Sequence, residues 1–169
     1  MRDSNAEDAR DNGDGAARLA DELVRFFRLG ARCKGVLNSG DLGAEFSALM
    51  LLLPLRDIGP MRVTDLAEVK QADPSTISRQ VAQLVKAGLA RREADPGDGR
   101  ASRLALTDAG QSACKQMREA RQALIGETLS HWPASRVATF ADLFEDFNSS
   151  VEALLRTMPA ATPSSREIV

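Results

Sequence analysis

The sequence predicts a mainly α-helical fold that carries one small β-hairpin. Apolar residues recur every three or four positions over most of the 169-residue chain, which is helical spacing. Two short alternating runs, "LARREA" and "SRLAL", lie close together between residues 89 and 106, and such alternation is typical of strands. With 43% hydrophobic and 27% charged residues, the chain is long enough for one globular unit, or for two small lobes that share a core.

The first fourteen residues are predicted to form a disordered acidic arm. Residues 1–14 hold two Arg against five Asp or Glu, a net charge of -3, and few apolar side chains. A long amphipathic helix is expected next, because apolar residues then step by threes and fours: Leu19, Leu23, Phe26, Phe27, Cys33 and Leu37.

The segment "SGDLG" is expected to end this first helix. A second helix then carries Phe46, Leu49, Met50 and Leu53. Pro54 should bend or end it near "DIGP", because proline lacks the N–H that a helix interior needs.

A helix-turn-helix is predicted after this point. Thr64 can cap a short helix, "DLAEVK", which buries Leu66 and Val69, and the turn "QAD" follows it. Asp73 is a good N-cap for the second helix.

Pro74 suits the first position of this second helix, because an N–H there would have no intrahelical partner. The helix is expected to run through Ala87, and Gly88 then ends it as a left-handed residue.

The period then changes from helical to strand-like. The two alternating runs are separated by the seven-residue loop "DPGDGRA", which is too long and too rich in glycine for a tight two-residue turn. We therefore expect a hairpin with a projecting loop, that is, a wing.

Two further helices are expected after the wing. Thr107 begins the first, which stops near "HWPAS". The last carries an apolar stripe that must be buried against something: Val137, Phe140, Leu143, Phe144, Phe147, Val151, Leu154 and Leu155. Residues 157–169 are expected to form a flexible tail.

The helix from Pro74 presents a polar face suited to DNA. The side chains opposite its apolar positions bear hydroxyls, an amide and positive charges, and they are Ser75, Thr76, Arg79, Gln83 and Lys86. A major groove admits such a helix, and these groups can read base edges, while the first turn can bind phosphate. A solvated helix face would have the same composition, so this observation alone does not decide.

The predicted wing strengthens the DNA interpretation. Residues 61–103 hold eight Lys or Arg against six Asp or Glu, a local net charge of +2, although the whole chain carries -2. Basic side chains surround the hairpin at Arg91, Arg92, Arg100 and Arg103. Arg100 at a loop tip can enter a minor groove, and Asp98 can hold its guanidinium through a charge-assisted pair. The alternative is an ordinary salt bridge in solvent.

The order helix, turn, helix, glycine, strand and "DPGDGRASRLALTDAG" resembles the multiple-antibiotic-resistance regulator (MarR) family of bacterial transcription factors. The residues that match the family's wing signature are Asp98, Arg100, Leu106, Thr107 and Gly110, and "TISRQVAQLVKAGLARR" is similar to its recognition helix and first wing strand. The resemblance covers roughly residues 16–156 in element order and is specific over about 61–110.

The resemblance implies a winged helix-turn-helix lobe at 59–106 and a helical dimerisation region at 15–58 and 107–156. It implies a homodimer that binds a palindromic operator in double-stranded DNA as a repressor. A cytoplasmic protein is expected separately, because the sequence shows neither a membrane-spanning run nor the pattern of a secretory signal or transit peptide. Carried over by position, Ser75, Thr76, Ser78, Arg79 and Gln80 would meet bases and phosphates and Arg100 the minor groove. The full expected contact set adds Gln83, Lys86, Asp98 and Arg103.

The resemblance also implies release from DNA by a small amphipathic or phenolic effector, or by an oxidant. Here the effector cleft would be lined by Phe26, Phe27, Cys33, Phe46 and Met50, which are equally ordinary core positions. One branch of the family senses peroxide through a Cys in the first helix paired with Tyr. The chain has no Tyr and Cys33 lies late in the first helix, which argues against this branch. Cys33 and Cys114 are far apart and lack CxxC spacing, so they are expected to be reduced cysteines on helices.

Other classes of function find little support in the sequence. No Ser-His-Asp order, phosphate loop or clustered acid pair indicates an enzyme, and no cofactor is expected. A zinc site would need a cluster of His and carboxylates, and His131 is the only His, so zinc is not expected either. His131 is expected to be a surface residue in a connection between helices. No apolar run is long enough to span a membrane. The remaining alternative is a winged-helix module that binds a protein without specific DNA binding.

Overall fold

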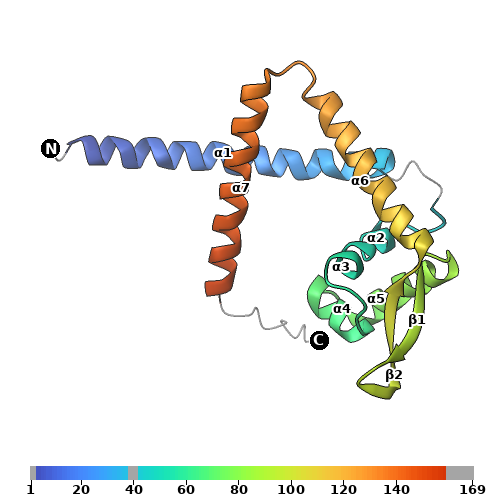
Figure 1. Ribbon diagram of the computed structural model, residues 1–169. Helices are drawn as coiled ribbons and strands as arrows, with labels where there is room; N and C mark the ends of the chain where they lie inside the picture. Colours follow the sequence, from blue (N-terminus) through green and yellow to red (C-terminus); the bar gives the residue numbers. More distant parts are fainter. Residues whose placement is uncertain (1–2, 38–41, 159–169) are drawn as a thin grey trace, which may run out of the picture. The chain divides into compact units, whose positions relative to one another are not determined.

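The computed structural model describes residues 3–37 and 42–158, and it divides into two compact units, Met1–Gln122 and Ala123–Val169. The elements in chain order are α1 (Asp3–Leu37), α2 (Phe46–Leu49), α3 (Leu52–Asp57), α4 (Val63–Lys70), α5 (Pro74–Lys86), β1 (Ala90–Asp95), β2 (Asp98–Leu106), α6 (Asp108–Thr128) and α7 (Ala134–Thr157). The fold is mainly helical with one antiparallel hairpin, as the sequence predicts (Figure 1).

Helix α1 confirms the long amphipathic helix but begins earlier than expected. It starts at Asp3, so the structure describes residues 3–14 as helical where we expected a disordered arm. Acidic residues near a helix N-terminus interact favourably with the helix dipole, which is a local reason for this extension. The described part of the tail ends at Met158, and the expectation for 159–169 lies outside the described residues.

The helix expected across Pro54 is in fact two short helices. Helix α2 ends at Leu49, a turn occupies Met50 and Leu51, and α3 begins at Leu52. Pro54 is therefore the third residue of α3 and not the breaking point. In the first turn of a helix its missing N–H removes no hydrogen bond, so the chain accommodates it by starting a new helix just before it.

Helix α4 differs from expectation at its start and on its buried face. Arg62, not Thr64, is the N-cap, and its backbone N–H donates to the Asp65 carboxylate at 3.2 Å. Leu66 is fully buried, but Val69 is 50% exposed and Ala67 is buried instead. The sequence did not predict this buried face of α4, because Ala67 is small and weakly hydrophobic and therefore adds little to the apolar pattern.

Helix α5 begins and ends where the sequence predicts. Asp73 is its N-cap with Pro74 in the first position, and Gly88 follows its end with a left-handed φ of 71°. The turn before it contains Gln71, also left-handed, at φ 47°. Ile77, Val81 and Leu84 are buried on its inner face.

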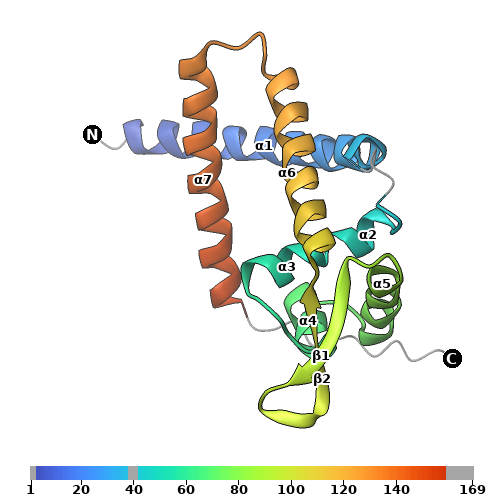
Figure 2. The same ribbon diagram turned by 45° about the vertical axis from the view of Figure 1, so that its right-hand side comes forward.

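The core of the winged lobe lies between α2, α3, α4, α5 and the base of the hairpin. It is built from aliphatic side chains that include Leu49, Leu52, Leu66, Leu84 and Leu104. Met61 joins it by an isolated bridge to Leu104, with N–O distances of 3.2 and 2.8 Å. From this core the hairpin projects beyond the helices (Figure 2).

The hairpin is longer and more tightly turned than predicted. Asp95 pairs with Asp98, so only Pro96 and Gly97 form the turn, whereas we expected a seven-residue loop. The next pair is Ala94 with Ser102, which leaves residues 99–101 as extra residues on β2. Glycine is common in loops and in β-bulges alike, so the glycine-rich sequence did not distinguish the two.

Thr107 and Gly110 join the wing to α6. The Thr107 hydroxyl donates to Gly88 O at 2.6 Å and accepts from Gly110 N at 3.1 Å, and Thr107 N donates to Leu89 O at 3.2 Å. A Cβ at position 110 would lie 2.0 Å from Leu89 O. Only glycine therefore allows this close approach of α6 to the first wing strand.

The second unit contains the end of α6, the connection at His131 and α7. His131 is exposed in that connection. Trp132 packs against Phe140 with ring centroids 5.9 Å apart, and the Arg136 guanidinium lies 4.1 Å from the Trp132 ring centroid. The predicted apolar stripe of α7 is present, and it is largely exposed in the single chain.

Candidate nucleic-acid interface

The first turn of α5 is held in place by Asp73. Its carboxylate accepts from the backbone N–H groups of Ser75 at 2.8 Å and Thr76 at 3.1 Å, and from the Ser75 hydroxyl at 2.5 Å. The Ser75 hydroxyl, followed by the two backbone N–H groups, lowers the pKa of Asp73. The carboxylate therefore fixes the end of the helix that is best suited to meet an anion.

The polar face of α5 is open to solvent. The exposed members of the expected contact set on this helix are Ser75, Thr76, Ser78, Arg79 and Lys86. The Arg79 guanidinium lies back along the helix, with Nε 3.4 Å from Ser75 O and Nη2 3.4 Å from the Ser75 hydroxyl. These long hydrogen bonds leave Arg79 free to reorient towards a partner.

Two residues of the expected DNA-contact set on α5 are less accessible to a partner. Gln80 and Gln83 are half-buried. The Gln83 side-chain oxygen accepts from Glu45 N at 3.3 Å, so Gln83 ties α5 to the start of α2. This partner is 38 residues away, and the sequence offered no signal for it.

The wing turn is held by Arg62, which sequence reasoning missed. Its Nε lies 2.7 Å from Asp95 Oδ2 and its Nη2 lies 3.7 Å from Asp98 Oδ2. The Arg62 hydrogen bond lowers the pKa of Asp95, whose other oxygen accepts from Gly97 N at 2.8 Å. The sequence alone gave no reason to pair Arg62, which lies just before α4, with Asp95.

Asp98 does not hold the Arg100 guanidinium, so that expectation is corrected. Its carboxylate accepts from the backbone N–H of Arg100 at 3.1 Å and faces Arg62. Within the described residues, the Arg100 side chain makes no ion pair and is exposed. Asp98 thus orients the Arg100 backbone and leaves the guanidinium free.

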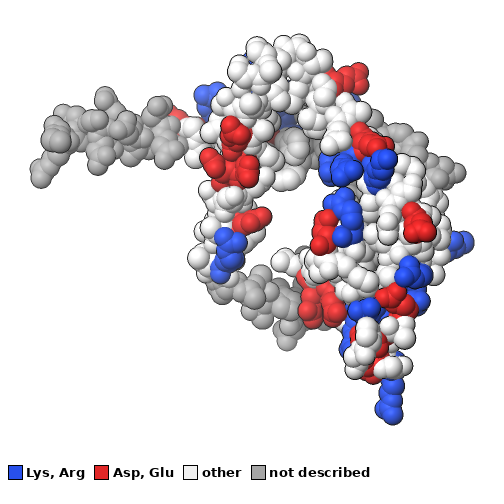
Figure 3. Space-filling model, in the orientation of Figure 1, with Lys and Arg blue, Asp and Glu red and all other residues white. Residues whose placement is uncertain are grey.

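The other basic residues of the hairpin differ in how free their side chains are to contact DNA. Arg103 and Arg91 both pair with Glu93, at 2.9 and 3.1 Å, and Arg103 is only 28% exposed in its side chain. Arg92 Nη1 lies 3.4 Å from the Ser102 hydroxyl. Arg100 is therefore the freest cation near the tip, where Figure 3 shows Lys and Arg side chains along the hairpin.

Of the residues expected to line an effector cleft, Phe46 and Met50 lie beside the same small cavity. Phe46 and Met50 line a small cavity of about 110 Å³ together with Leu53 and Met117. Phe26 and Phe27 are 59% and 70% exposed on α1 and are not among its lining residues. The side chain of Cys33 lies outside the described residues.

Cys114 is buried in α6 and its pKa is raised, chiefly by burial. Its thiol lies 3.8 Å from Leu52 O. Among the described residues, no group of three or more His, Cys, Asp or Glu is arranged to hold a metal ion. No helix in the described ranges combines the length and apolar character of a membrane span.

Comparisons with known proteins agree with this geometry. The model of the MarR family matches residues 45–102, from the start of α2 into β2. The Bacillus subtilis (strain 168) protein named uncharacterized HTH-type transcriptional regulator YxaD is 35% identical over 106 residues, which are 63% of this chain and 74% of that protein.

Solved structures show the same fold. A MarR family protein from Bacillus stearothermophilus matches with a TM-score of 0.70 at 18% identity, over 82% of this chain and 97% of that chain. Wild-type MarR from E. coli, in its apo form, matches with a TM-score of 0.60 at 25% identity, over 74% of this chain and 96% of that chain. The chain belongs to the MarR family of winged helix-turn-helix transcriptional regulators.

Proposed function

We propose that two copies of this DNA-binding regulator form a dimer on a palindromic operator and repress transcription in the cytoplasm. Each copy would place α5 in a major groove and its wing in the adjacent minor groove. Two observations carry this: the capped first turn of α5 is exposed together with Arg79, and Arg100 of the wing is exposed and makes no ion pair within the described residues.

On this surface, Ser75 and Thr76 are positioned at the helix N-terminus to meet phosphate, and Arg79 to meet base edges. Ser78 and Lys86 extend the contact, with Gln80 at its edge. Arg100 enters the minor groove from a bulge that Asp98 and Arg62 hold. Gln83 and Arg103 serve mainly inside the protein, since their partners Glu45 and Glu93 already engage them.

The dimer is supported by apolar side chains that the single chain leaves exposed on α1 and α7. Phe26, Phe27, Leu143 and Leu154 are each more than half exposed. Soluble monomers rarely leave such stripes open, and a two-fold dimer buries the same patch of both copies. A small amphipathic or phenolic effector would bind beside Phe46 and Met50 and release the operator.

Operator binding can be measured by fluorescence anisotropy on duplex DNA taken from upstream of the protein's own gene. Arg79→Ala should weaken binding by about 1 to 3 kcal/mol and relax sequence preference. Arg100→Ala should weaken binding and reduce the slope of log affinity against log salt by about 1. Arg156→Ala, which removes an equal charge from α7, is the control.

Unchanged affinity in both wing and helix variants would contradict this assignment. Affinity for duplex that is absent or insensitive to salt would instead favour a winged-helix module that binds a protein. The naming of the curated relative as a transcriptional regulator supports DNA as the partner.

A further inference from the structure

Arg62 differs from the other cations near the wing because it contacts the wing turn from outside the hairpin. It is the N-cap residue of α4, and its side chain reaches the turn between β1 and β2. Its Nε lies 2.7 Å from Asp95 Oδ2, and its Nη2 lies 3.7 Å from Asp98 Oδ2. Two carboxylates of the hairpin therefore fix the position of this guanidinium.

Most of the N–H groups of this guanidinium remain open. The contact with Asp95 is a hydrogen bond, whereas the separation of 3.7 Å from Asp98 is too long to be one. A guanidinium carries five N–H groups, so four of them have no hydrogen-bond partner in the described part of the chain. The Arg62 side chain is 41% exposed, so a partner can reach these groups from solvent.

The guanidinium of Arg62 also lies close to the residue proposed to enter the minor groove. Asp98 accepts from the backbone N–H of Arg100 with one oxygen, at 3.1 Å, and its other oxygen faces Arg62. A single carboxylate therefore separates the Arg62 guanidinium from the backbone of Arg100. The minor groove of B-DNA is only about 6 Å wide and is walled by phosphates. With Arg100 in this groove, Arg62 would lie beside one of its walls.

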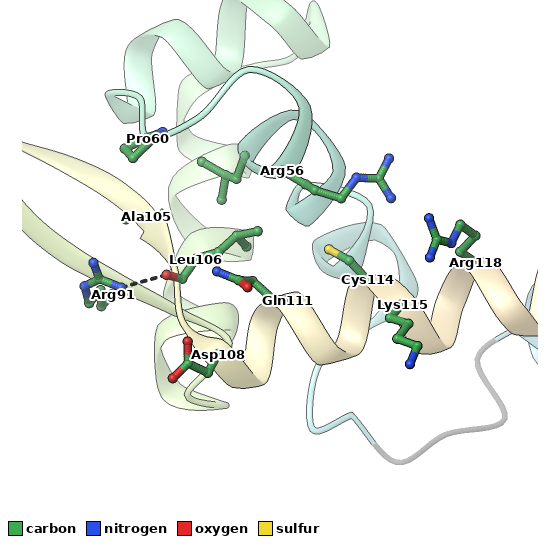
Figure 4. A pocket seen from close by; sticks show the side chains of 11 residues that line it. Arg56, Pro60, Arg91, Ala105, Leu106, Asp108, Gln111, Cys114, Lys115 and Arg118 are labelled. Atoms are coloured by element: carbon green, nitrogen blue, oxygen red, sulfur yellow. Dashed lines mark hydrogen bonds between the residues drawn. The ribbon is translucent and has the colours of Figure 1, made fainter.

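Two other cations of the hairpin are engaged away from the turn. Arg91 donates to Leu106 O at 2.7 Å, at the base of the hairpin (Figure 4). Arg91 and Arg103 also share the carboxylate of Glu93, at 3.1 and 2.9 Å. Neither of these side chains is free to meet a phosphate beside the turn, whereas Arg62 is held there.

The charges of the turn give Arg62 a further role. Asp95 and Asp98 place two carboxylates within a few residues of the single cation Arg100. Carboxylates repel the DNA backbone, and the charge of Arg62 offsets this repulsion. The N–H groups of arginine point in different directions, so one edge of the guanidinium can bind a carboxylate while another edge binds a phosphate.

We propose that Arg62 binds a phosphate of the operator backbone, at the wall of the minor groove that Arg100 enters. Its Nε stays on Asp95, and its Nη2 exchanges the long contact with Asp98 for a phosphate oxygen. This inference rests on the proposed function, since it adds a backbone contact to the same DNA-binding surface. It assigns that contact to the start of α4, which belongs neither to the recognition helix nor to the wing.

A scan with neutral methylphosphonate linkages tests this contact. Duplex DNA from upstream of the protein's own gene is prepared with one phosphate neutralised at a time, and binding of the full chain is measured by fluorescence anisotropy. Wild type should bind about tenfold more weakly wherever a contacted phosphate is neutral. In Arg62→Gln, one of these positions should lose the effect, because the protein partner of that phosphate is already absent.

Three further variants separate a phosphate contact from a role in positioning the wing. Asp95→Asn keeps an oxygen for Gly97 N but removes the charged partner of Arg62, so it loosens the turn while the cation remains. It should keep the effect at the position that Arg62→Gln loses. Arg62→Lys should keep part of that effect, because the positive charge remains. Arg56→Gln removes an equal charge from α3 and should keep the effect at every position. Circular dichroism checks that each variant is folded.

The possible results lead to different conclusions. If wild type binds the duplex but Arg62→Gln keeps the effect at every position, this inference is overturned and the proposed function stands. If Asp95→Asn loses the effect at the same position as Arg62→Gln, Arg62 only positions the wing, and the phosphate contact is overturned. Failure of wild type to bind any duplex would overturn the proposed function, and this inference with it.

Discussion

At the residue scale, Asp73 is the side chain that makes the recognition helix start where it does. Its carboxylate satisfies two backbone N–H groups and one hydroxyl, which keeps its folded-state pKa below that of the unfolded chain. For a carboxyl with a lowered pKa, the stabilisation is present above the unfolded pKa, near 3.9, and is lost as pH falls through the folded value.

Asp73→Ala should therefore lower the melting temperature by a few degrees at neutral pH, because the first turn of α5 loses its cap. The difference from wild type should shrink as the pH is lowered below about 4. Differential scanning calorimetry from pH 3 to 7 measures this. Asp142→Ala, an exposed carboxylate within α7, should not lower the melting temperature.

Gly110 provides a second prediction at this scale. Gly110→Ala should destabilise the chain by about 1 to 3 kcal/mol, because the new Cβ would lie 2.0 Å from Leu89 O. Gly126→Ala on the same helix is the matched control. Nothing lies within 4 Å of that Cβ, so alanine should stabilise by about 0.4 to 1 kcal/mol. Urea unfolding compares the two, and equal effects would contradict the close approach.

These residues also show what the sequence could predict. Asp73, Pro74 and Gly88 were assigned correctly, because each acts on backbone groups within a few positions of itself. Thr107 was assigned correctly as the start of α6 because its hydroxyl accepts from Gly110 N three residues on, but its hydrogen bond to Gly88 O, 19 residues away, could not be predicted. Arg62 was missed since its partner Asp95 is 33 residues away, and no local pattern reports such a distance.

At the scale of elements, the wing is a two-strand hairpin with a bulge whose turn is fixed from outside by Arg62. The sequence predicted its strands but not its register, because glycine-rich residues fit a loop and a bulge equally well. In the same way, the single helix expected from Phe46 is divided by a turn at Met50 and Leu51. This turn changes which side chains face the core, so that Leu49 is the one predicted apolar position that is fully buried, while Leu51, Leu52 and Leu55 are buried as well.

Arg62→Gln should loosen the wing turn without unfolding the lobe. Amide hydrogen exchange in residues 95–101 should become faster by several-fold, since Asp95 and Asp98 lose their shared partner. Mass spectrometry of peptides from this segment measures the exchange. Arg56→Gln, which removes an equal charge from the same lobe, should leave it unchanged, and unaltered exchange in Arg62→Gln would contradict the anchoring role.

At the scale of the whole molecule, the apolar stripes of α1 and α7 point to assembly. We expect a solution mass of about twice the 18.2 kDa of the chain at micromolar concentration. Leu143→Glu should shift this mass towards that of the monomer, because Leu143 is 63% exposed in the single chain and would be buried in a dimer. Analytical ultracentrifugation measures the mass, and Glu145→Gln is the control on the same helix.

The apolar stripes could be predicted from the sequence, because the helical spacing of apolar residues is the same whichever surface packs against them. The surface that covers these stripes could not be predicted in the same way, because a contact between two copies produces no periodic pattern in the sequence of one chain. The expected cleft shows the same limit. Phe46 and Met50 line one small cavity because they lie one helical turn apart in the sequence, whereas no spacing in the sequence relates Phe26 or Phe27 to them.

The junction of Gly110 with Leu89 has a mechanical consequence. The two backbones are in contact there, and Thr107 adds hydrogen bonds to Gly88 and Leu89. The first turn of α6 is therefore held rigidly against the residues that follow α5. A helix is stiff and rises about 1.5 Å per residue, so α6 acts as a lever arm. A rotation of α6 would therefore turn α5 and the wing together with it, because the contact between Gly110 and Leu89 leaves no room for independent movement.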